Sequence, residues 1–173
     1  MQYSVVSYNE IKSTKDFRVD AEFYDPKYLE LEKLLDKKKA VSYGDLCKEV
    51  RCGPFGSTIL CDSYQENGVI VARPFNIKEL TLENDNLASI SKEDVKLKNL
   101  KVYDKGDILF SRVGDIKCGV VPNYFVNSIT ISPNIIATKV NKDKLNPYYA
   151  VTFFNTRYGL PQIARGLKMV AQP

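Results

Sequence analysis

Histidine is absent from this chain of 173 residues. Its absence excludes histidine acid–base catalysis, Ser-His and Cys-His nucleophile pairs, and histidine metal sites. Long apolar runs are absent too, since none approaches the roughly 20 residues that cross a bilayer. Met1-Gln2-Tyr3 does not open a signal peptide. We therefore expect a cytoplasmic protein that has no contact with a membrane.

The sequence also lacks any C-x-x-C pair, although it contains 4 cysteines. A zinc ribbon or a thioredoxin-type site is therefore not expected. In a cytoplasmic chain, small buried thiols are the expected role of Cys47, Cys52, Cys61 and Cys118.

What the sequence does contain is typical of one globular domain: 44% hydrophobic and 27% charged residues. The charge is unevenly distributed. Up to Asp115 there are 18 Lys/Arg against 20 Asp/Glu, whereas from Ile116 onward there are 7 against one. This asymmetry fits either an anionic partner of the C-terminal part or a solvated lysine surface balanced elsewhere in the fold.

Local signals predict helices and strands that do not alternate regularly. Asp25-Pro26, Ser91 and Asn146-Pro147 have the composition of helix starts, and Gly159 is placed to end the helix that Asn146 begins. β-Branched or apolar runs predict strands at 69–72, 108–113 and 134–140. A helical turn is expected over 43–49, and another over 160–165. We expect a single α+β domain with a twisted mixed or antiparallel sheet and packed helices.

Three catalytic patterns are incomplete. Asn146-Pro147-Tyr148-Tyr149 lacks the second proline of amino-methylating enzymes, and a helix N-cap explains it fully. Glu10-Ile11-Lys12 has no preceding acidic partner for a metal-dependent nuclease. The Gly53–Ser57 stretch is too short for a P-loop. We therefore expect no catalytic residue, metal or cofactor in this chain.

Two glycine loops and one arginine are candidate contacts to nucleic acid. Gly53-Pro54-Phe55-Gly56-Ser57 offers backbone N–H groups, a hydroxyl and an aromatic ring. A turn at Gly114 follows a predicted strand and can project Arg112 and Lys117. Arg73 ends another strand. A structural turn with Phe55 in the core, and surface ion pairs for the cations, are the alternatives that the sequence leaves open.

The order of these segments resembles a target recognition domain of type I restriction–modification specificity subunits. The resemblance is carried by five segments: 53–57, 68–77, 105–114, Asn146-Pro147-Tyr148-Tyr149 with Phe154-Asn155-Thr156, and the closing Gly166–Pro173. The leader Arg18–Tyr28 is similar to openings in that family. The match covers nearly the whole chain.

The resemblance implies sequence-specific reading of double-stranded DNA, without catalysis, in a restriction system. In the family, each such domain reads half of a bipartite site, and partner subunits supply methyl transfer, ATP-driven translocation and cleavage. The expected partners are therefore DNA, methyltransferase (modification) subunits and a restriction/translocase subunit. The implied DNA-binding residues are Gly53, Phe55, Gly56, Ser57, Arg73, Asn76, Ser111, Arg112, Gly114, Lys117, Arg165 and Lys168.

We expect an N-terminal arm over 1–25 and the recognition domain over 26–173. The family's long C-terminal spacer helix is not in the sequence, so a truncated chain and a half-type subunit both stay open. About five phosphate contacts are expected from the basic C-terminal section, which contains Lys139, Lys142, Lys144, Arg157, Arg165 and Lys168. The alternative functions are the recognition domain of a fused type II methyltransferase–nuclease, and an assembly or protein-interaction module without DNA binding.

Overall fold

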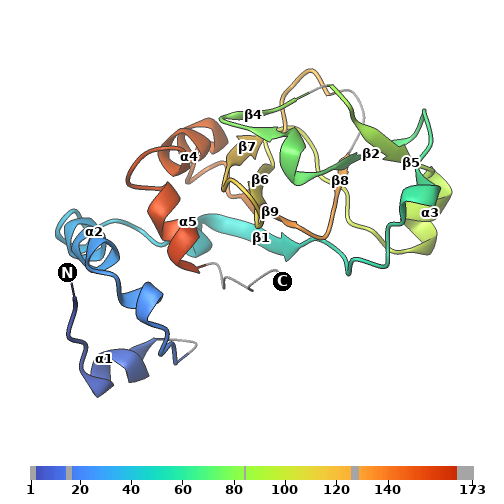
Figure 1. Cartoon of the computed structure of the whole chain (residues 1–173). Coiled ribbons are helices and arrows are strands. Elements are labelled where there is room, and N and C mark those ends of the chain that lie inside the picture. The colour runs from blue at the N-terminus through green and yellow to red at the C-terminus, as the bar shows by residue number, and fades with distance from the viewer. Residues whose placement is uncertain (1–2, 15–16, 84, 126–128, 167–173) are drawn as a thin grey trace.

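The computed structural model describes residues 3–14, 17–83, 85–125 and 129–166. Three helices open the chain: α1 (Tyr8–Ser13), the 3-10 helix η1 (Ala21–Tyr24) and α2 (Pro26–Lys37). The predicted start of α2 is confirmed, because the Asp25 side chain accepts a hydrogen bond from the Lys27 N–H and Pro26 occupies the first turn. In Figure 1 these helices lie to one side of the β-sheets.

A four-stranded antiparallel sheet forms the middle of the molecule (Figure 1). Its strand order is β1 (Cys47–Cys52), β9 (Ile135–Val140), β6 (Ile108–Ser111) and β7 (Cys118–Val120). Both β1 and β6 run antiparallel to β9. The C-terminal ends of β1 and β6 therefore both lie beside the first residues of β9.

A second sheet has three strands in the order β5 (Ala88–Ile90), β2 (Val69–Ala72) and β8 (Ile129–Ile131). β2 pairs antiparallel with β5 and parallel with β8. A small hairpin joins β3 (Ile77–Lys78) to β4 (Thr81–Leu82). With helices beside both sheets, the chain is the single mixed α+β domain that the sequence predicts.

Short helices complete the fold. α3 (Lys92–Leu97) and α4 (Pro147–Phe154) begin where expected, because the Ser91 hydroxyl and the Asn146 amide oxygen cap them. α5 (Leu160–Gly166) follows α4. The remaining 3-10 turns are η2 (Tyr43–Leu46), η3 (Cys61–Ser63) and η4 (Pro74–Asn76).

Apolar side chains fill two main layers of core. One lies between the two sheets and includes Ile131, Ile135 and Leu109. The other lies between the four-stranded sheet and α4, where the Phe110 and Phe154 rings meet edge to face with centroids 5.2 Å apart. These layers hold the strand ends in fixed positions.

Three local predictions need correction. The helical turn expected over 43–49 ends at Leu46, and the chain continues as strand β1, because pairing with β9 satisfies its backbone. The strand expected over 108–113 ends at Ser111. The helix begun by Asn146 ends at Phe154 rather than Gly159, which instead lies against the Phe153 backbone at the start of α5.

The cysteines are also less buried than expected. Cys118 is buried, and that burial raises the pKa of its thiol, but Cys52 and Cys61 are exposed and Cys47 is half-buried. Among the residues that the structure describes, no helix has the length and apolar character needed to cross a membrane.

Candidate nucleic-acid interface

The turn between β8 and β9, residues 132–134, is the place where three strand ends meet. Two of them belong to the four-stranded sheet: after β1, the Gly53 N–H donates to the Ile135 carbonyl at 2.8 Å, and after β6, the Arg112 N–H donates to the Asn134 carbonyl at 2.9 Å. The structure therefore places the Gly53 loop and the Gly114 loop beside the same turn.

The third strand end comes from the other sheet. β2 runs parallel to β8, and the Ser132 N–H donates to the carbonyl of Ala72, the last residue of β2, at 2.9 Å. Arg73 follows directly. We call the segments 53–57, 73, 112–117 and 132–134 the strand-end cluster. It unites regions that are far apart in the sequence and that the sequence analysis singled out separately.

Gly53 allows this close approach. A Cβ atom on Gly53 would lie 2.0 Å from the Ser132 carbonyl oxygen, which no side chain tolerates. Gly53 is therefore a packing residue of the cluster rather than a group that faces a ligand.

The tip of the same loop is open. Phe55, Gly56 and Ser57 are all exposed, and a Cβ on Gly56 would meet nothing within 4 Å. The Phe55 ring is 89% exposed, so the alternative in which this ring enters the core is wrong. The loop presents a ring, a hydroxyl and backbone amides to the outside.

The 112–117 loop is built around buried Ser111. Its hydroxyl donates to the Asp115 carbonyl at 2.8 Å and accepts from the Lys117 N–H at 2.8 Å. Gly114 has φ +67°, the left-handed region that glycine adopts without strain. Ser111 therefore shapes the loop from inside, in contrast to the contact role expected for it.

Arg112 is the exposed cation of this loop. Lys117 is half-buried, and its ammonium lies 3.8 Å from the Asp115 carboxylate, which is itself at the solvent-facing tip. An ion pair this exposed contributes little to stability. Lys117 therefore remains able to exchange Asp115 for another anion.

Arg73 is half-buried and held in place. Its Nη2 donates to the Asn86 carbonyl at 2.5 Å, and its guanidinium lies over the Phe75 ring, 4.4 Å from the centroid. Its Nε is buried and has no hydrogen-bond partner among the described residues. A guanidinium stacked in this way is orientated before any ligand arrives.

Asn76 is fully buried, in contrast to its expected place in the interface. Its Oδ1 accepts from the Arg73 N–H at 3.0 Å and its Nδ2 donates to the Asp85 carbonyl at 3.3 Å. An amide can satisfy both a donor and an acceptor in one position, which explains why a polar residue is buried here. Asn76 fixes the backbone of Arg73 and cannot reach a ligand itself.

Arg165, another expected contact, is engaged inside the protein. Its Nε donates to the Phe23 carbonyl at 2.9 Å, its Nη1 lies 3.0 Å from a Glu32 carboxylate oxygen, and the Phe23 ring lies against the guanidinium. Arg165 thereby attaches α5 to η1 and α2, and we leave it out of the interface. Lys168 lies outside the described residues.

Most of the described part of the basic C-terminal section lies away from the cluster, although Arg157 lines a groove together with Gly114 and Asp115. Lys142 and Lys144 are exposed, but they follow the end of β9 that lies opposite to the 132–134 turn. Lys139 is paired with the Asp107 carboxylate at 3.3 Å. Burial raises the pKa of that carboxyl, against the lowering effect of the Asp104 N–H and of Lys139.

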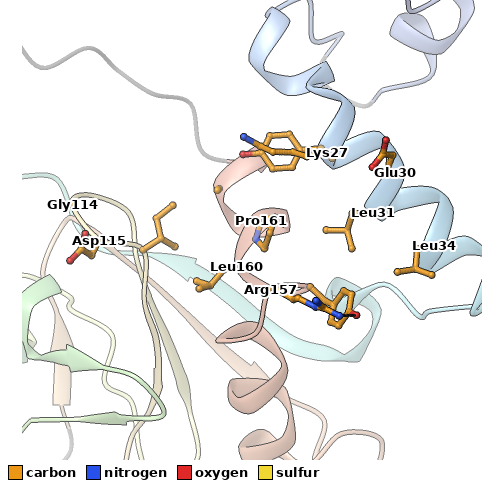
Figure 2. Close-up of a pocket in the computed structure, with 13 residues that line it drawn as sticks. Lys27, Glu30, Leu31, Leu34, Gly114, Asp115, Arg157, Leu160 and Pro161 are labelled. Atoms are coloured by element: carbon orange, nitrogen blue, oxygen red, sulfur yellow. Dashed lines mark hydrogen bonds between the residues drawn. The ribbon is translucent and has the colours of Figure 1, made fainter. Parts of the chain in front are cut away.

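A groove beside the 112–117 loop is mainly apolar (Figure 2). α5 lies between that loop and α2, with Pro161 facing Leu31 of α2 and Leu160 on the side of the loop. The charged residues that line the groove are Lys27, Glu30, Asp115 and Arg157. In the described ranges, no group of three or more Cys, Asp or Glu is arranged to hold a metal ion.

Two solved structures resemble this one. The HsdS subunit from Thermoanaerobacter tengcongensis has a TM-score of 0.48 and 13% identity, over 94% of this chain and 40% of that one. A chain described under complex assembly and conformational transition of the type I R-M system has a TM-score of 0.45 and 16% identity, over 82% and 36%.

The folded chain has only a weak likeness to these two solved chains. It spans less than half the length of the solved chains that it matches. Neither protein-family models nor curated proteins match the sequence. Identities and TM-scores this low carry no argument about the function of this chain.

The 132–134 turn is not among the sequence predictions, which place Asn134 in a strand that in fact begins at Ile135. Ser132-Pro133-Asn134 between two apolar runs is a recognisable turn signal. Nothing local indicates, however, that three other strand ends would converge on it. Like Arg73 Nε, the Ser132 hydroxyl is buried and has no partner among the described residues.

Proposed function

We propose that this chain is a DNA target recognition domain of a type I restriction–modification specificity subunit, with no catalytic centre of its own. The observation that carries the proposal is the strand-end cluster, in which the loop after β1, with exposed Phe55 and Ser57, and the loop after β6, with exposed Arg112, are bonded to neighbouring residues at the start of β9. The ordered sequence motifs that resemble the family supply the same segments.

The chemistry of the exposed groups suits duplex DNA. Arginine can pair with both acceptors of guanine in the major groove, while hydroxyl and backbone N–H groups bind phosphate oxygens. Arg112 and Ser57 offer these groups, and stacked Arg73 offers a second orientated guanidinium. We leave Asn76, Ser111, Gly53 and Arg165 out of direct contact and assign them to the support of the loops.

The proposal includes the partners and place that the family implies. Methyltransferase and restriction/translocase subunits would bring methyl donor, ATP and metal, and the complex would act on DNA in the cytoplasm. The proposed division is an arm over 1–25 and the recognition domain over 26–173. Arg165 on α5 would attach the arm to that domain through Phe23 and Glu32.

A selection from a library of random duplexes tests the proposal. The chain, alone and bound to its modification subunit, should enrich a short fixed half-site. Arg112→Ala should remove or change at least one fixed base, whereas Lys144→Ala, at the opposite end of β9, should leave the site unchanged. Recovery of all sequences in equal amounts by the wild-type protein would contradict sequence recognition.

A further inference from the structure

Phe55 is a large apolar side chain that the fold leaves in water. Its ring is 89% exposed, although the loop that carries it joins two well-packed regions. Single exposed apolar residues are common on protein surfaces. This one differs because it stands at the tip of the strand-end cluster and because its position is fixed from both sides.

The loop is clamped at its two ends. Before Phe55, the Gly53 backbone is bonded to Ile135 and packs on Ser132. After it, the Thr58 N–H donates to the Phe55 carbonyl at 2.9 Å, and Ile59 is buried against Val71. The backbone on both sides of Phe55 is therefore held in place.

The composition of the loop tip favours stacking of Phe55 on bases over hydrogen bonding to base edges. From Gly53 to Gly56 the tip has no side chain that can donate or accept a hydrogen bond at a base edge. Gly56 has open space around it and no side chain to hold the backbone away from a sugar–phosphate chain. Such a tip suits stacking, and apolar wedges that enter between base pairs kink the duplex.

We propose that Phe55 inserts its ring between two adjacent base pairs and thereby bends the bound DNA. This inference rests on the proposed function, since it requires DNA at the strand-end cluster. Arg112 and Ser57 would contact the strands beside the opened step, and the energy needed to deform that step would contribute to sequence preference without a base-edge contact.

The experiment measures bending and base unstacking separately from affinity. Duplexes labelled at both ends report the bend by fluorescence transfer, and 2-aminopurine placed at each position in turn reports unstacking. Wild-type protein should bring the ends closer and unstack a single step. Phe55→Ala should abolish both signals and weaken binding by about tenfold, which corresponds to the loss of one base–aromatic stack.

Two further variants control the result. Phe55→Leu keeps an apolar wedge and should retain most of the bend. Tyr149→Ala removes another exposed aromatic ring, from the start of α4 at the opposite end of β9, and should change neither signal. All three variants should unfold at the wild-type midpoint, because both rings are exposed.

The outcomes separate this inference from the proposed function. Sequence-selective binding with equal bending by wild type and Phe55→Ala overturns the insertion alone. If Phe55 is needed for bending, and all duplexes are bound and bent to the same extent, the insertion is supported and sequence recognition is overturned. Absence of binding to any duplex overturns both.

Discussion

Gly53 and Gly56 stand three positions apart in one loop and meet opposite surroundings. A Cβ on Gly53 would lie 2.0 Å from the Ser132 carbonyl oxygen, whereas a Cβ on Gly56 would have no neighbour within 4 Å. We predict that Gly53→Ala lowers the free energy of unfolding by about 1–3 kcal/mol, because the turn must move away. Gly56→Ala should leave the urea unfolding midpoint unchanged. Equal midpoints for the two variants would contradict this packing.

Asn76 illustrates a residue that is polar for structural reasons. Its amide joins the Arg73 N–H to the Asp85 carbonyl in a fully buried position. We predict that Asn76→Ala costs about 1–3 kcal/mol of unfolding free energy, because buried backbone groups lose their partner. Urea denaturation measures this cost.

The matched variant for Asn76 is Asn86→Ala in the neighbouring loop, where the backbone carbonyl, which the substitution keeps, accepts from Arg73. Asn86→Ala should lower the free energy of unfolding much less than Asn76→Ala. Its remaining cost comes from the positive φ of 54° at position 86. If Asn76→Ala unfolds like the wild type but binds DNA more weakly, Asn76 is a contact after all.

Among the elements, those with local end signals could be predicted and those formed by distant pairing could not. Asp25-Pro26 and Asn146-Pro147 contain their own caps, so α2 and α4 begin where the sequence indicates. β1 is an edge strand with mostly exposed side chains, and only its pairing with β9 makes it a strand. No alternation of apolar residues distinguishes it from a turn.

In the candidate site, too, local signals could be predicted and contacts with distant residues could not. The exposure of Phe55 and Arg112 agrees with the loops that the sequence indicated, since glycine turns after strands lie at the surface. The burial of Asn76 and the ion pair of Arg165 with Glu32 depend on partners 9 and 133 positions away. Composition alone gives no sign of such partners, and both residues were therefore assigned to the interface.

Arg165 makes the side-chain hydrogen bond and the ion pair between α5 and the N-terminal helices, which makes this attachment testable. Arg165→Met removes the bond to the Phe23 carbonyl and the ion pair with Glu32, while Glu32→Gln removes the ion pair only. We predict about tenfold faster amide exchange in η1 and α2 for Arg165→Met, a smaller increase for Glu32→Gln, and no change in β6 or β9. Unchanged exchange with weaker DNA binding would instead restore Arg165 to the interface.

At the scale of the whole molecule, the net charge of a segment does not indicate where its cations lie relative to the strand-end cluster. The C-terminal part of the sequence carries the basic excess, yet β9 extends for 6 residues, roughly 20 Å, between the strand-end cluster and the segment that holds Lys142 and Lys144. Lys139 and Arg165 are paired with acidic groups. Among the described residues, Arg112, Lys117 and Arg73 are therefore the cations that the cluster itself offers to DNA.

This placement changes the expected salt dependence of DNA binding. Five phosphate contacts would give a slope of log K against log salt of about −4.5, whereas two or three give about −2 to −3, because each contact releases somewhat less than one counterion. We predict the shallower slope for the wild type, measured by fluorescence anisotropy across salt concentrations. Arg112→Gln should reduce its magnitude by about 1.

The matched control removes more positive charge, but from a segment distant from the strand-end cluster. The double variant Lys142→Gln/Lys144→Gln loses two positive charges where Arg112→Gln loses one, yet it should keep the wild-type slope. Charge at that distance from the cluster, beyond the roughly 8–10 Å over which salt screens, contributes little to local phosphate contacts. A larger reduction of the salt slope in the double variant than in Arg112→Gln would indicate that DNA binds at the opposite end of the sheet. The strand-end cluster would then need another role.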